Sequence, residues 1–306
     1  MILKKRVESE ELVIHNYLCN RINFSLTDTQ RHQRLKDGYH GELLFDSFTS
    51  KITCEHVIIQ DLLLSWNNTL FQIDTLLVLP SLLYVYEVKN FKEDYIYGDK
   101  HLIKLPHFEV QNPLHQVQKS ETLLQHLVKS MGHRPVVNSK VVFVNPSFFM
   151  YQTPQSLPFL FNSQLKKHIQ SISSSTSSLT PKDNQLVNSI MDTHIPKYPN
   201  PTIPKYSFES INKGARCIKC GSIDTLFNGK SVVCTSCGGK MNLEKTILKN
   251  AEEFTILFPN IDLTTVNLQR FCRIFTCKRT IRNVLAKYFD QLDNTNPIKF
   301  YKRDLF

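Results

Sequence analysis

Apolar residues in the first half of the chain follow two patterns, helical spacing and nearly unbroken runs. Residues 12–18 and 41–48 have the spacing of amphipathic helices. Three runs rich in Val, Ile, Leu, Tyr and Phe then predict strands over 56–64, 70–79 and 82–91. Pro80 and Ser81 predict a tight turn between the last two. Such continuous apolar runs are typical of strands in a sheet that is covered on both faces.

Helical spacing returns at 113–128, and the apolar run at 140–144 predicts another buried strand. Helices and strands in this order predict an α/β or α+β domain over residues 1–195, with its core at 38–150. Residues 196–213 are rich in Pro, and we expect them to form a linker of semi-extended chain.

The last part of the chain, 241–306, predicts three helices. Apolar spacing places them at 243–254, at 261–274 with a capping residue near Thr264, and at 277–289. A brief break separates the last two, which is the order of a helix-turn-helix. The alternative is a three-helix cap whose basic face is simply solvated.

The last two helices separate an apolar face from a polar one. The residues expected to pack together are Leu268, Phe271, Cys272, Ile281, Val284 and Leu285. The residues expected to face outward and to contact DNA are Arg273, Lys278, Arg279, Arg282 and Asn283. In a helix-turn-helix the second helix enters the major groove of duplex DNA, so this face is the predicted DNA-binding surface.

Charge is distributed unevenly along the chain, which has a net charge of +10. Residues 1–196 carry 19 Lys and Arg against 18 Asp and Glu, whereas residues 197–306 carry 18 against 9. Concentrated positive charge favours a polyanionic partner such as DNA, because neutralising phosphates releases counterions. A basic surface that only keeps the protein soluble is the alternative.

Composition excludes several classes of protein. An apolar fraction of 41% with 20 Phe residues supports a hydrophobic core, which excludes a disordered or fibrous chain. The first residues become charged before an apolar stretch of signal-peptide length develops. The longest apolar runs, such as 75–79 and 82–86, are too short to span a bilayer. We therefore expect a cytoplasmic protein without a membrane partner; oligomeric state leaves no pattern in the sequence.

Four of the eight cysteines form two C-x-x-C-G repeats within residues 214–240. They are Cys217, Cys220, Cys234 and Cys237. A hairpin that turns at Asn228 and Gly229 separates the two repeats. Four thiolates complete a tetrahedral shell, so this zinc ribbon is expected to hold a structural Zn²⁺ with no open position for catalysis. A redox dithiol pair is the alternative, although it would need only one such repeat.

Charged residues interrupt two of the predicted strands. Because the turn after residue 79 is tight, Asp74 is expected to lie across from Glu87, with Lys89 on the same face. Burying such groups without a partner costs roughly several kcal/mol of folding free energy, so they must be paired or must bind a metal. Carboxylate oxygens suit Mg²⁺ or Mn²⁺. An ion pair at a strand edge is the alternative for the Glu-x-Lys tripeptide taken alone.

Four motifs in order resemble a known family. They are His40-Gly41-Glu42, Phe71-Gln72-Ile73-Asp74, Tyr86-Glu87-Val88-Lys89-Asn90-Phe91 and Gln111-Asn112-Pro113-Leu114-His115-Gln116. With them, residues 38–130 resemble the nuclease-related domain, NERD, of the restriction-endonuclease-like PD-(D/E)xK superfamily. The resemblance implies a central mixed sheet flanked by helices and a Mg²⁺-dependent phosphodiesterase site. Ile73 stands where that superfamily has Pro before the first Asp.

The resemblance also implies roles for single residues. Asp74 and Glu87 would hold the metal, helped by the Val88 carbonyl. Lys89 would orient the attacking water and offset charge on the phosphate, and Gln116 would assist its positioning. Glu42 would bind a second metal or a metal-bound water. These roles agree with general chemistry, because a metal polarises a phosphoryl oxygen and a cation stabilises the transition state.

The sequence therefore favours a Mg²⁺-dependent or Mn²⁺-dependent nuclease, an endonuclease acting on DNA, which docks through its zinc ribbon and helix-turn-helix. One rival is a DNA-binding regulator that has a nuclease-like core but does not cut. Another is a scaffold in which the charged residues are only paired with one another. Fold alone does not choose among them.

Overall fold

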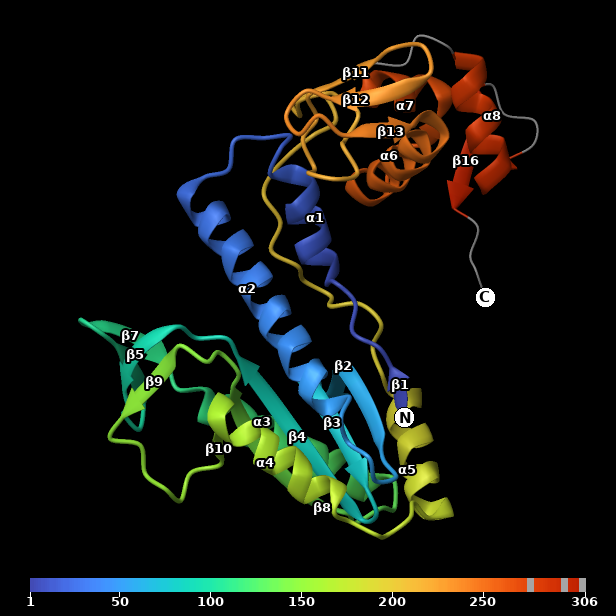
Figure 1. Cartoon of the computed structure of the whole chain (residues 1–306). Helices are drawn as coiled ribbons and strands as arrows, with labels where there is room; N and C mark the ends of the chain where they lie inside the picture. Colours follow the sequence, from blue (N-terminus) through green and yellow to red (C-terminus); the bar gives the residue numbers. More distant parts are fainter. Residues whose placement is uncertain (274–277, 293–296, 303–306) are drawn as a thin grey trace. The chain divides into compact units, whose positions relative to one another are not determined.

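The structure, a computed structural model, describes residues 1–273, 278–292 and 297–302. Contacts divide the chain into two compact units (Figure 1). The first consists of Met1–Glu8 and Gln33–Asn200, and the second of Ser9–His32 and Pro201–Phe306. Residues 9–32 are predicted as part of the first domain but belong to the second unit, because local spacing does not reveal with which distant segment a helix packs.

A six-stranded mixed sheet with the order β1-β2-β3-β4-β8-β10 forms the base of the first unit. Its strands are β1 (Ile2–Lys4), β2 (Val57–Trp66), β3 (Thr69–Leu79), β4 (Leu82–Lys89), β8 (Val136–Phe143) and β10 (Phe159–Phe161). Strands β2, β3 and β4 pair antiparallel, whereas β1, β8 and β10 join in parallel. The strands predicted from apolar runs are confirmed, as is the turn at Pro80 and Ser81.

Helices cover both faces of this sheet. They are α2 (Leu26–Thr49), α3 (Pro113–Ser130), α4 (Asn162–Ser173) and α5 (Pro181–Asp192). Helices α3 and α5 pack on one face through residues such as Val117 and Ile190, and α2 and α4 pack on the other through Phe45 and Leu165. The predicted mixed sheet flanked by helices is confirmed. Like every helix in the described parts of the chain, these are too short or too polar to cross a membrane.

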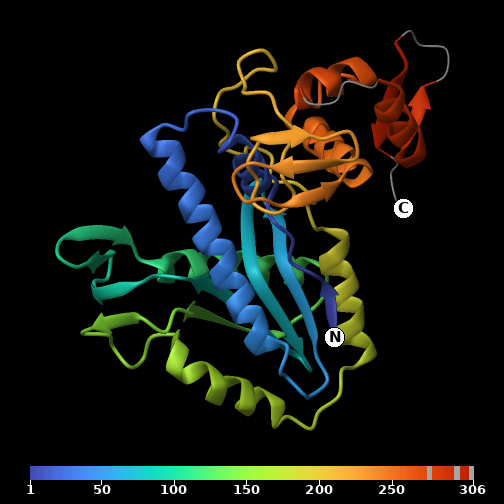
Figure 2. The ribbon, with the colours of Figure 1, turned by 45° about the horizontal axis from the view of Figure 1, so that its top comes forward.

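A second, smaller sheet follows directly after β4. Its order is β7-β6-β5-β9, with β5 (Glu93–Ile96), β6 (His101–Lys104), β7 (Phe108–Gln111) and β9 (Phe148–Tyr151). Figure 2 shows it in green to the left of the long strands. The sequence did not predict these strands, because each has only four residues and mixes charged with apolar positions.

The second unit combines a short N-terminal helix with the last hundred residues. Its elements are α1 (Glu10–Leu18), β11 (Thr225–Phe227), β12 (Ser231–Cys234), β13 (Lys240–Asn242), α6 (Leu243–Leu257), β14 (Leu263–Thr264), α7 (Thr265–Cys272), α8 (Lys278–Tyr288), β15 (Phe289–Leu292) and β16 (Lys299–Lys302). Strands β11, β12 and β13 form one antiparallel sheet, and a second has the order β14-β16-β15. The predicted break at 275–276 lies outside the described residues.

One hydrophobic core serves the whole second unit. Leu18 of α1, Val232 of β12, Phe254 of α6 and Phe271 of α7 are all buried in it. Phe208, from the segment expected to be a linker, is buried in the same core. The cysteine-rich sheet and the helices are therefore packed together as one body.

A buried ion pair fastens the N-terminal segment into this core. Arg21, directly after α1, donates from Nε to Glu253 Oε1 at 2.6 Å, and both side chains are at most 1% exposed. It also donates to the carbonyls of Asn212 and Gly214, and its guanidinium lies 3.9 Å from the centre of the Phe271 ring. Removing one partner of such a pair leaves a buried charge without compensation.

We predict that Arg21→Met lowers the free energy of unfolding of the second unit by about 3–5 kcal/mol. The control is Arg270→Met, because Arg270 and its partner Glu209 are 53% and 74% exposed and such a pair contributes about 1 kcal/mol or less. Far-UV circular dichroism follows both units, whereas fluorescence of the single Trp, Trp66 in β2, follows the first. An equal shift in the two variants would contradict this prediction.

Candidate active site and metal centre

The pairing of β3 with β4 ends where the acidic residues begin. The last paired residues at this end are Thr75 and Tyr86. Beyond them β3 continues alongside β2, and β4 continues alongside β8. The Val88 N–H donates to Asp74 Oδ2 at 2.7 Å, so a carboxylate replaces a ladder bond at this point. The separation of the two strands leaves room for side chains between them.

Four of the predicted site residues meet at or beside this separation. Asp74 and Glu87, the next residues of the two strands, are only 8% and 3% exposed. Lys89 Nζ donates to Glu87 Oε1 at 2.6 Å and to Gln116 Oε1, from α3, at 3.2 Å. The structure thus brings Asp74, Glu87, Lys89 and Gln116 together.

Glu42 joins the same group from α2, and the carboxylates oppose one another's ionisation. Burial, together with repulsion from the Asp74 carboxylate, raises the pKa of Glu42 to about 8 and that of Glu87 also to about 8. Burial likewise raises the pKa of Asp74. Burial disfavours the charged form of Lys89, but the Glu87 and Asp74 carboxylates outweigh it and raise the pKa of the amine.

The donor set fits a magnesium ion better than it fits a metal with a full protein cage. Among the described residues, only the four cysteines, whose Sγ atoms all lie within 4.8 Å of one another, form a group of three or more side chains close enough to hold a metal. Mg²⁺ usually binds through one or two carboxylates and keeps several waters. Asp74 and Glu87 would supply these carboxylates, and a divalent cation would relieve their repulsion. The Val88 carbonyl stays a predicted ligand.

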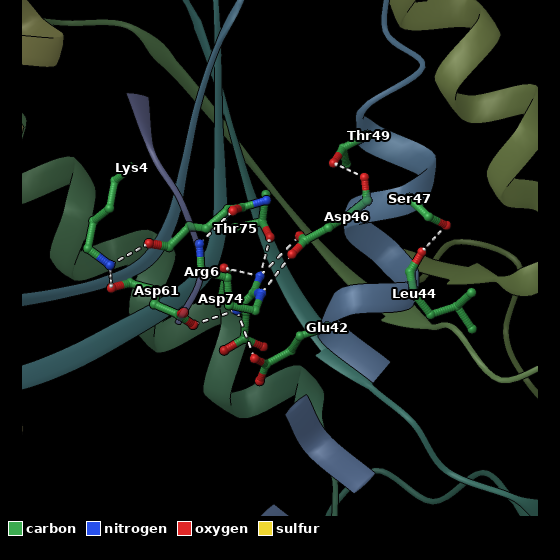
Figure 3. Close-up of polar contacts among 11 residues, drawn as sticks. Lys4, Arg6, Glu42, Leu44, Asp46, Ser47, Thr49, Asp61, Asp74 and Thr75 are labelled. Carbon is green, nitrogen blue, oxygen red and sulfur yellow. Dashed lines mark hydrogen bonds and ion pairs between the residues drawn. The ribbon is translucent and has the colours of Figure 1, made fainter. Parts of the chain in front are cut away.

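Three polar residues of this site were not found from the sequence: Arg6, Asp46 and Asp61. Figure 3 shows the Arg6 guanidinium surrounded by Glu42, Asp46 and Asp61, with Asp74 beside it. Asp46 lies four residues after Glu42 and so on the same face of α2. Asp61 interrupts the apolar run of β2 in the way Asp74 interrupts β3. Asp46 and Asp61 could therefore have been found from their positions in the sequence. Arg6 carried no such signal, since it lies far from the motifs in sequence.

The four cysteines of the second unit form a cluster of the size that zinc requires. Cys217 Sγ and Cys237 Sγ are 3.8 Å apart, and Cys220 Sγ and Cys234 Sγ are 3.6 Å apart. Zn–S bonds of about 2.3 Å in a tetrahedron place the sulfurs about 3.8 Å from one another. The donor set and spacing therefore suit a structural Zn²⁺ bound by four thiolates.

The predicted DNA-contacting residues lie on the surface of α7 and α8. The hydroxyl of Thr264 accepts a hydrogen bond from the Asn267 N–H, which is the predicted cap of α7. On α8, Ile281, Val284 and Leu285 are buried. The exposed residues are Lys278, Arg279, Arg282 and Asn283, and Arg273 is exposed at the end of α7. The predicted division into an apolar and a basic face is present.

Comparison with known proteins finds one similarity, and it lies within the first unit. Residues 37–144 match the family model of the nuclease-related domain, NERD. The matched segment includes Glu42, Asp74, Glu87, Lys89 and Gln116. No curated protein and no solved structure matches the chain.

Close approach of α2 to the end of β4 positions Glu42 in the first unit. A Cβ added at Gly41 would lie 2.4 Å from Asn90 Cβ. Asn90 has little freedom to move away, because its Nδ2 donates to the Asp37 carbonyl and its Oδ1 accepts from Asn145 Nδ2. Only glycine fits at this contact. The Gly-Glu pair of the first motif thus combines a packing requirement with a carboxylate of the acidic group.

We predict that Gly41→Ala destabilises the first unit by about 1–3 kcal/mol through overpacking. Gly38→Ala is the matched control on the same helix, because a Cβ at Gly38 has no atom within 4 Å. That control should stabilise the domain by about 0.5–1 kcal/mol, since alanine is the better helix former. Urea unfolding followed by Trp66 fluorescence measures both. A stabilising effect of Gly41→Ala would contradict the predicted contact.

Proposed function

We propose that the chain is a divalent-metal-dependent nuclease, an endonuclease that hydrolyses DNA phosphodiester bonds. The observation that carries the proposal is the meeting of Asp74, Glu87 and Lys89 where β3 and β4 separate, within the segment that matches NERD. Burying two carboxylates and an ammonium group as isolated charges costs free energy. Together they suit a metal ion, which the carboxylates would bind, and a phosphate, which the ammonium group would contact.

Each residue has a defined task in this proposal. Asp74 and Glu87 would hold one Mg²⁺ or Mn²⁺, which when bound polarises the scissile phosphate and acidifies water. Lys89 would turn from Glu87 toward the phosphate, where its ammonium orients the attacking water and offsets the charge that develops. Gln116 holds Lys89 by accepting a hydrogen bond from Nζ. Glu42 would accept a hydrogen bond from a metal-bound water.

The second unit would bind the DNA. Helix α8 presents Lys278, Arg279 and Arg282 to solvent, directly after α7 in the order of a helix-turn-helix. The paired strands β15 and β16 follow α8, and their residues Phe289 and Phe300 are buried in the same core as the helix. The four thiolates would hold a structural Zn²⁺ that keeps β11, β12 and β13 folded beside these helices.

We predict that Lys89→Met lowers the rate of plasmid nicking in Mg²⁺ or Mn²⁺ by about 100-fold or more, because a cation at the developing charge is lost. The control is Lys92→Met, whose side chain is 57% exposed and contacts only Asp37 among the described ion pairs. That variant should nick at close to the wild-type rate. Nicking by Lys89→Met as fast as wild type would overturn the assigned role.

The rival functions give different results in the same assay. Wild-type protein that binds DNA but never cuts it, with either metal, would favour a non-catalytic regulator. The Glu87–Lys89 ion pair at 2.6 Å is the observation that favours this alternative function, because paired groups need no metal. Calorimetry that detects no uptake of Mg²⁺ or Mn²⁺ in the presence of DNA would favour a scaffold.

We predict that Arg282→Ala weakens binding to duplex DNA several-fold. It should also make the negative slope of log affinity against log salt shallower by about 1, because one phosphate contact is lost. Lys249→Ala is the control, since Lys249 is an exposed lysine of α6 that pairs with Glu252. Fluorescence anisotropy at several salt concentrations measures both. Equal slopes in the two variants would exclude α8 as the docking surface.

A further inference from the structure

All three nitrogens of the Arg6 guanidinium donate hydrogen bonds to groups of the acidic site. Nε donates to Asp46 Oδ2 at 2.9 Å, and Nη1 donates to Glu42 Oε2 at 2.8 Å and to Asp61 Oδ1 at 2.5 Å. Nη2 donates to the Asp74 carbonyl at 2.8 Å. It also donates to Thr75 Oγ1 at 3.1 Å. A guanidinium has five N–H groups, so each of them has an acceptor here.

The Arg6 side chain is buried among three carboxylates, in surroundings that favour a positive charge. Arg6 is only 1% exposed, while its three carboxylate partners are 15–20% exposed. These partners come from two elements, Glu42 and Asp46 from α2 and Asp61 from β2 (Figure 3). Asp61 has a φ of 52°, an unusual conformation for a residue other than glycine, and its Oδ1 is directed at Arg6.

Charge counting indicates how many divalent ions the site needs. The five carboxylates are Glu42, Asp46, Asp61, Asp74 and Glu87, and the three cations among them are Lys4, Arg6 and Lys89. When all eight groups are charged, the formal charge that remains is −2, the charge that one divalent cation neutralises. Without Arg6 it would be −3, which one such ion leaves uncompensated.

We propose that the Arg6 guanidinium occupies the position of a second divalent cation, so that the site binds a single metal ion at Asp74 and Glu87. This inference rests on the metal-dependent function proposed above and makes it more specific. Glu42, Asp46 and Asp61 are each engaged by this fixed internal cation. Arg6 is thus a positioning residue, and it lies outside the segment that matches the family.

The number of bound ions tests this proposal directly. Zinc-loaded full-length chain is titrated with Mn²⁺ alone, and bound Mn²⁺ is counted by electron paramagnetic resonance. Ions that are lost in Asp74→Asn belong to the acidic site. Wild type should bind one such ion, with the spectrum of an isolated Mn²⁺. Arg6→Met should bind two, with a spectrum broadened by coupling, since paired ions lie about 3.5–4 Å apart.

Two further variants keep the test decisive. Arg6→Lys keeps the positive charge and should bind one ion, which separates charge from packing. Arg6→Gln removes the charge but retains hydrogen-bonding groups, and it takes the place of the Met variant if that chain does not fold. Two coupled ions in the wild type, or one ion in a folded neutral variant, would overturn the role of Arg6. An absence of Asp74-dependent Mn²⁺ in the wild type would instead contradict the metal-dependent nuclease.

Discussion

Repulsion among buried carboxylates is the constraint around which the first unit is arranged. Asp74, Glu87 and Glu42 approach one another from two strands and a helix, and burial makes each negative charge harder to maintain. A chain that only had to be stable would fill this space with apolar side chains, because buried ion pairs add little to stability. Cations from two distant segments, Arg6 and Lys89, offset the cost instead.

The second unit meets a similar constraint with different chemistry. Arg21 and Glu253 form its buried ion pair. Its four clustered cysteines, of which Cys217 and Cys234 are buried and Cys220 and Cys237 exposed, suit a structural Zn²⁺. In both units, then, a cation held beside acidic side chains offsets the cost of burying them.

Much of this arrangement could be predicted from local patterns. The long strands, the position of α3 and the apolar face of α8 follow from spacing alone, and Asp74, Glu87 and Lys89 follow from charges placed on apolar strands. The four-residue strands of the small sheet could not be predicted, because they are too short for a periodicity to develop. The two-residue strand β14 escapes for the same reason.

Long-range partnerships were the other gap. The helix-forming pattern of α1 gives its buried face but not the core that receives it, and Arg6 carries no mark that separates it from an exposed arginine. Asp46 and Asp61 lie between these cases. Each occupies a position from which its direction could be inferred, four residues after Glu42 or within an apolar strand, but neither belongs to the motifs that drew the interpretation to the site.

The assembly of the second unit from Ser9–His32 and Pro201–Phe306 has a consequence for how the protein is made. Leu18 and Arg21 leave the ribosome before the surfaces that bury them, which are synthesised almost two hundred residues later. Domains usually fold as units during synthesis, and this one cannot close its interior until its second segment has been made. Until then, the apolar face of α1 lacks the core that buries it in the folded protein.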